Sequence, residues 1–121
     1  MTPDEYRAAQ AKAMTEAQLQ TQVLALARAF GWTRRFHATI AIRSVPGFPD
    51  LVLVHPGQRR VLWRELKTER GTVTGPQQDW LTDLAAAGQD AAVWRPTDLI
   101  AGRIEAVLRG AQKGPRPCPT P

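Results

Sequence analysis

The chain has 121 residues, enough for one domain with a single hydrophobic core. Its 16 Lys and Arg residues exceed its 11 Asp and Glu residues, and the net charge of +5 suits a polyanionic partner without requiring one. No apolar run approaches the roughly 18 residues that span a bilayer, and the first residues lack the apolar stretch of a secretory signal. The single cysteine excludes an internal disulfide and a Cys-x-x-Cys zinc site, so we expect a protein of the reducing cytoplasm.

The first 30 residues carry two helical patterns. Each begins with a capping box, in which a Thr is followed three residues later by Glu or Gln. The boxes predict a short helix over residues 2–13 and a longer, amphipathic helix from about Glu16 to Phe30, which Gly31 ends. We interpret residues 1–14 as an N-terminal helical arm.

Three short stretches rich in β-branched and aromatic residues follow, and they predict strands at 33–40, 50–55 and 60–67. The segment 43–49 contains two prolines and a glycine, which indicates a loop. Pro56-Gly57 is a turn signal, so the second and third strands should form a hairpin.

The C-terminal part alternates helix and strand. Thr74 is placed to cap one helix, residues 91–95 resemble a short strand, and Thr97 is placed to cap a final helix. The Pro-rich tail 111–121 is predicted to be disordered, which leaves one domain over residues 15–110. This order predicts an α/β fold with a mixed central sheet flanked by helices.

The residues that indicate chemistry lie at the ends of the predicted hairpin. Side chains alternate along a strand, so Glu65 and Lys67 share one face while Leu66 points into the core. The hairpin can bring Asp50 beside Glu65, and two such carboxylates repel each other unless a cation lies between them. A hard divalent ion would accept both carboxylates and the Leu66 carbonyl, and Lys67 would add a positive charge beside a phosphate. Taken alone, Pro-Asp or Glu-x-Lys is more often simply structural.

The combination resembles the PD-(D/E)xK nuclease superfamily, and the wider pattern is similar to a stand-alone VRR-NUC (virus-type replication–repair nuclease) domain of phages and prophages. The resemblance covers about residues 15–109. The matching stretches are Thr15-Glu16 with Gln20, His37, Pro46-Gly-Phe-Pro-Asp50-Leu-Val-Leu-Val54, Glu65-Leu-Lys-Thr68, Gly71, Gln77-x-x-Trp80, Gly88 and Val93-Trp-Arg-Pro-Thr-Asp98.

The resemblance implies an αβββαβ core and DNA phosphodiester hydrolysis that depends on Mg²⁺ or Mn²⁺. It implies that Asp50, Glu65 and Glu16 bind the metal, that Lys67 is the catalytic cation, and that Gln77 supports the site or the DNA. It further implies a homodimer acting on branched DNA such as four-way (Holliday) junctions, in a bacterial cell and encoded by a phage or prophage.

Several polar residues near these blocks are predicted to contact DNA: Gln20, His37, Arg43, Ser44, Thr68 and Arg70. Arg34, Arg35 and Arg64 are also expected near the site. Such contacts position a duplex and do not read its sequence. Each arginine is as readily explained as a solvated side chain, and His37 as a hydrogen-bonded structural residue.

Structural explanations compete for other residues. Glu16 occupies a helix start, where acids are favoured anyway, and Gln77 stands at a capping-box position. Trp63, Trp80 and Trp94 are better explained as packing residues than as platforms for bases. Two alternative functions remain open: a non-catalytic DNA-binding module, and a nuclease with another preference, such as flap cutting, nicking or restriction-like cleavage.

Overall fold

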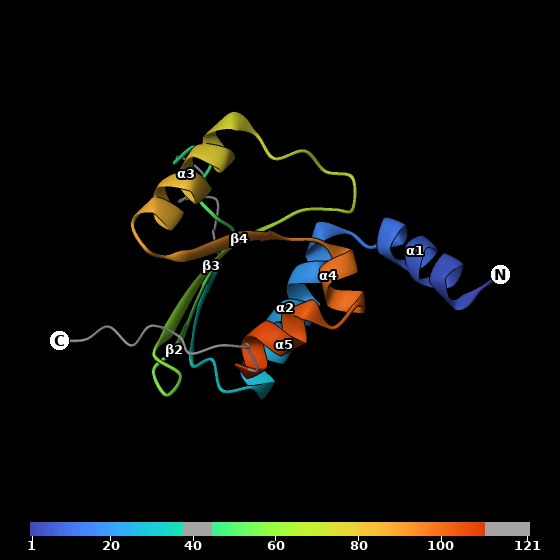
Figure 1. The fold of residues 1–121 in the computed structure, drawn as a ribbon, viewed down its shortest axis with the longest axis horizontal. Helices are drawn as coiled ribbons and strands as arrows, with labels where there is room; N and C mark the ends of the chain where they lie inside the picture. Colours follow the sequence, from blue (N-terminus) through green and yellow to red (C-terminus); the bar gives the residue numbers. More distant parts are fainter. Residues whose placement is uncertain (38–44, 111–121) are drawn as a thin grey trace.

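The computed structural model describes residues 1–37 and 45–110 (Figure 1). Its elements are α1 (Pro3–Ala13), α2 (Glu16–Ala29), β1 (Arg34–His37), β2 (Leu51–His55), β3 (Arg60–Leu66), α3 (Gly75–Ala86), β4 (Asp90–Trp94), α4 (Pro96–Ile100) and α5 (Arg103–Arg109). The predicted αβββαβ core is therefore confirmed as α2-β1-β2-β3-α3-β4. Among the helices of this described part, none is long and apolar enough to cross a membrane.

The four strands form one mixed sheet in the order β1-β2-β3-β4. The β1–β2 and β2–β3 pairs are antiparallel, while β3 and β4 are parallel and are joined by the α3 crossover. The helix α3 lies on one side of the sheet, and α2, α4 and α5 lie on the other (Figure 1). The predicted hairpin is correct, because residues 56–59 form the tight turn between β2 and β3.

The main core lies between the sheet and the helices α2, α4 and α5. Its buried side chains are Leu19, Val23, Ala27, Trp32, Leu51, Leu53, Leu62, Leu66, Trp94, Ile104 and Leu108. On this same face Arg64 pairs with Asp90 at 2.8 Å and lies over the Trp94 ring. The prediction that Arg64 lies near the reaction site is therefore wrong, since alternation along β3 puts it on the face opposite Glu65.

The prediction of a single C-terminal helix is also wrong, because this segment forms two helices. These are α4 and α5, separated by Gly102 with a φ of +80°. Thr97 does not cap them, because its hydroxyl is hydrogen-bonded to the Glu69 carboxylate from the loop after β3. The start of α4 is stabilised instead by Asp98, which accepts the backbone N–H of Arg95 at 2.8 Å.

The N-terminal arm is helical as predicted, and α1 packs against α4. Its capping box is complete, with the Thr2 hydroxyl and the Glu5 carboxylate each accepting the other residue's N–H. The Pro-rich tail lies outside the described residues.

Candidate active site

Asp50 and Glu65 meet at the end of the β2–β3 ladder. Leu51 pairs with Arg64 in this antiparallel register, so the residue before Leu51 lies beside the residue after Arg64. The Asp50 carboxylate also accepts the backbone N–H of Leu66 at 2.7 Å. The hairpin and this hydrogen bond therefore bring the two acids together.

The loop that leads into Asp50 packs tightly against the start of α3. Gly47 has a φ of +78°, and a Cβ built there would lie 2.3 Å from the carbonyl carbon of Pro76. Only glycine allows that approach without moving a backbone. The indole of Trp80 donates a hydrogen bond of 3.0 Å to the carbonyl of Pro46. The loop and α3 are thus held together on the face of the sheet that carries Glu65.

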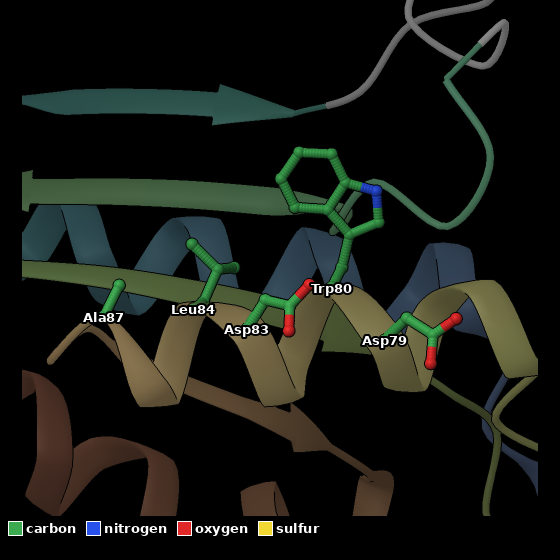
Figure 2. A pocket seen from close by; sticks show the side chains of 5 residues that line it. All are labelled: Asp79, Trp80, Asp83, Leu84 and Ala87. Atoms are coloured by element: carbon green, nitrogen blue, oxygen red, sulfur yellow. The ribbon is translucent and has the colours of Figure 1, made fainter.

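An aromatic cluster fills the space between this loop and the sheet. The ring of Phe48 meets Trp63, Trp80 and Phe36 edge-on, with centroids 5.2–6.4 Å apart. Figure 2 shows Trp80 pointing from α3 toward the strands. The shallow pocket beside it is lined by Asp79, Trp80, Asp83, Leu84 and Ala87. Packing therefore explains Trp63 and Trp80, as we predicted.

The Glu65 carboxyl is buried, and its two oxygens have different surroundings. Its Oε2 accepts a 3.0 Å hydrogen bond from the Gln77 side-chain amide and lies 3.9 Å from the Lys67 ammonium. When both acids are ionised, the buried Oε1 has no hydrogen-bond donor within the described residues. The pKa of Glu65 is raised to about 8 in total. Burial is the largest cause, a hydrogen bond shared with Asp50 and the negative charges of Asp50 and Glu16 add to the rise, and Lys67 opposes it.

These observations fit a hard divalent cation. Two neighbouring carboxylates, one with a buried oxygen that lacks a donor, are the ligands that Mg²⁺ and Mn²⁺ accept. In residues 1–37 and 45–110, no three His, Cys, Asp or Glu side chains gather closely enough to hold a metal alone. Asp50 and Glu65 would therefore be the direct carboxylate ligands, leaving positions for water, main chain or phosphate, as Mg²⁺ sites usually do. Glu16 influences Glu65 by its charge, and its role as a direct ligand stays a prediction.

Comparison with known families identifies the domain type. A family model described as VRR-NUC domain matches residues 5–97. The chain belongs to the VRR-NUC family. No curated protein and no solved structure gives a match. VRR-NUC domains are of the PD-(D/E)xK type, so membership implies a nuclease-type function and agrees with the four-stranded mixed sheet.

Gln77 serves two structural purposes in this VRR-NUC domain. Its side-chain oxygen accepts the N–H of Thr74 at 2.9 Å and completes the capping box of α3. Its side-chain nitrogen donates to Glu65. The two explanations that the sequence left open are therefore compatible, because the carbonyl and the amino group of one amide face different partners.

Three of the six predicted DNA-contacting residues of the VRR-NUC domain have side chains that the structure describes. Arg70 is exposed in the loop between β3 and α3, Thr68 is partly buried in the same loop, and Gln20 is partly buried on α2. The His37 side chain, Arg43 and Ser44 lie outside the described residues. All six remain predictions as DNA contacts.

Two residues of the VRR-NUC domain that sequence reasoning passed over organise the loop after Lys67. Arg95 donates hydrogen bonds to three carbonyls of this loop, and Glu69 binds Thr97. Both partnerships join positions more than 20 residues apart, so no local pattern marked them. The available signal was that Arg95 falls inside one of the family-like stretches.

Proposed function

We propose that this VRR-NUC domain is a Mg²⁺- or Mn²⁺-dependent DNA endonuclease that acts on branched DNA, such as four-way junctions, as a homodimer. The observation that carries the proposal is the Asp50–Glu65 pair with a buried, donorless oxygen and the Lys67 ammonium beside it. Membership of a nuclease family supports the same chemistry.

Each residue of the site has a distinct task in this proposal. Asp50 and Glu65 would hold the ion, which when bound lowers the pKa of water and offsets phosphate charge. Lys67 is nine-tenths buried and close to Glu65, so its ammonium can stabilise negative charge that develops on the scissile phosphate. Gln77 fixes the orientation of the Glu65 carboxylate by its hydrogen bond.

The homodimer and the branched substrate rest on the family resemblance and on size. One chain presents one acid pair, so cutting both strands calls for two copies related by symmetry. The chain has a net charge of +5, which favours any DNA backbone. Shape, more than sequence, would then select the substrate.

The test is a cleavage assay with labelled linear, flapped and four-way-junction DNA, in Mg²⁺, Mn²⁺ or EDTA, paired with a mass measurement in solution. Asp50→Asn and Lys67→Met should reduce the rate by about a hundredfold or more while junction binding persists. The matched controls Asp83→Asn on α3 and Lys12→Met on α1, both exposed, should cleave like the wild type.

The outcomes separate the alternatives. Metal-dependent cleavage of junctions by a dimer, lost in both site variants, supports the proposal. Cleavage that prefers flaps or linear duplex replaces the substrate and keeps the chemistry. Junction binding without cleavage in any divalent metal identifies a non-catalytic module, and undiminished cleavage in both site variants rejects the assigned residues.

A further inference from the structure

The loop between β3 and α3 is gathered around one arginine. The Nη1 atom of Arg95 lies within hydrogen-bonding distance of three carbonyl oxygens, those of Thr68 at 2.8 Å, Glu69 at 3.3 Å and Gly71 at 2.8 Å. Three acceptors from four consecutive residues thus converge on one charged donor. Hydrogen bonds from a charged group are stronger than neutral ones, so this contact defines the loop's conformation.

Other hydrogen bonds fix the loop and the backbone of Arg95 to the start of α4. The Glu69 carboxylate accepts the N–H of Thr97 at 3.1 Å and also its hydroxyl. The backbone N–H of Arg95 is held by Asp98 at 2.8 Å. The backbone at the start of α4 is therefore fixed, and the Arg95 side chain extends from it to the loop.

The Lys67 side chain lies on this same loop. Its backbone N–H donates to the carbonyl of Trp94 at 3.1 Å, immediately before Arg95. A Cβ added to Gly71 would lie 3.5 Å from Cδ of Lys67 and 2.9 Å from the Thr68 hydroxyl. The aliphatic part of Lys67 therefore runs closely over Gly71 on its way to Glu65, and a displaced loop would displace the ammonium.

We infer that Arg95 is a positioning residue, which holds the Thr68–Gly71 loop so that the Lys67 ammonium stays beside Glu65. The inference rests on the proposed function for the importance of Lys67 in cleavage. That Arg95 fixes the position of Lys67 does not depend on the proposed function, because it concerns the protein without DNA. Arg95 itself acts only through the loop.

A lysine-specific NMR experiment tests the structural part directly. The chain has 3 lysines, Lys12, Lys67 and Lys113, so a sample with ¹³C-labelled lysine gives few signals, and Lys67→Arg assigns one of them. In the wild type the Lys67 side chain should be more ordered than that of exposed Lys12. Arg95→Ala should move its signal toward that of exposed Lys12 and increase its mobility. Arg109→Ala, which removes an arginine paired with Glu105 at the end of α5, should not.

Cleavage kinetics test the consequence for the reaction. In Arg95→Ala, kcat should fall about tenfold to a hundredfold, because a charge displaced by about 1 Å loses much of its effect on the transition state. KM for DNA should remain within about twofold, since Arg95 is expected to act through the loop and not to contact the substrate. Arg95→Lys should recover only part of kcat, because it keeps the positive charge but its flexible, strongly hydrated ammonium is not held at the position of Nη1.

Each result counts for or against the inference. An unchanged Lys67 signal in folded Arg95→Ala, or a loss that appears only in KM, overturns it. If Arg95→Ala does not fold, Arg95→Lys and Gly71→Ala take its place, and an undisturbed Lys67 signal in both overturns it equally. A wild type without nuclease activity would reject the proposed function, whereas the NMR result would still decide whether Arg95 positions Lys67.

Discussion

Replacing Glu65 with glutamine should stabilise the metal-free protein at alkaline pH. The pKa of Glu65 is raised from 4.5 to about 8, first because burial penalises the charged form and then because Asp50 lies beside it. The folded protein therefore binds this proton more tightly than the unfolded chain does. The resulting stability is fully present below pH 4.5, decreases as the pH rises, and is lost above about pH 8.

The size of the effect follows from the two pKa values. A tenfold change in proton affinity is worth about 1.4 kcal/mol. Raising the pKa from 4.5 to about 8 therefore corresponds to at most about 5 kcal/mol of unfolding free energy. That is large beside the roughly 5–15 kcal/mol by which ordinary domains are stable. Glutamine cannot ionise but can still accept the hydrogen bond from Gln77. The variant should therefore lack most of the decrease in unfolding free energy that the wild type shows as the pH rises.

Urea unfolding in EDTA from about pH 5 to about pH 9 measures this effect in the wild type and in Glu65→Gln. The stability difference between them should grow with pH in favour of the variant, since groups that titrate in both proteins cancel. The control Glu105→Gln changes an exposed acid on α5 and should follow the wild type. Parallel curves for the wild type and Glu65→Gln would refute the burial argument.

Two further predictions concern the structure around the acid pair. Gly47→Ala should lower both the melting temperature and the cleavage rate, because its Cβ would collide with Pro76 at 2.3 Å; wild-type values of both would contradict this packing. Arg64→Ala should cost about 1–3 kcal/mol in urea unfolding, because Asp90 loses its 2.8 Å partner while Arg60 stays at 3.8 Å. DNA affinity, measured by fluorescence anisotropy, should not change, and a clear decrease would return Arg64 to the DNA-binding surface.

Local sequence signals correctly predicted the helix starts that are fixed by interactions between residues close in sequence. The capping boxes at Thr15 and Thr74 are each closed within four residues, and both helices begin where predicted. The same rule failed at Thr97, because Glu69 lies 28 residues away in sequence and binds the hydroxyl that would have capped the helix. Arg64 was misplaced for a different reason, because alternation along β3 already puts it on the same face as Leu66. Only its ion pair with Asp90 depends on β4 joining the sheet.

The sequence by itself determined the two acids, the lysine and the hairpin that joins them. The Asp50 and Glu65 positions follow from alternation along strands and a short turn, which are local properties. Only the tertiary structure decided how these groups behave. The high pKa of Glu65, its bond to Gln77 and the reach of Arg95 to the loop after Lys67 all depend on β4 and the helices α3 and α4 packing against the hairpin. Burial and long-range hydrogen bonds arise from that packing, and no short stretch of sequence contains them.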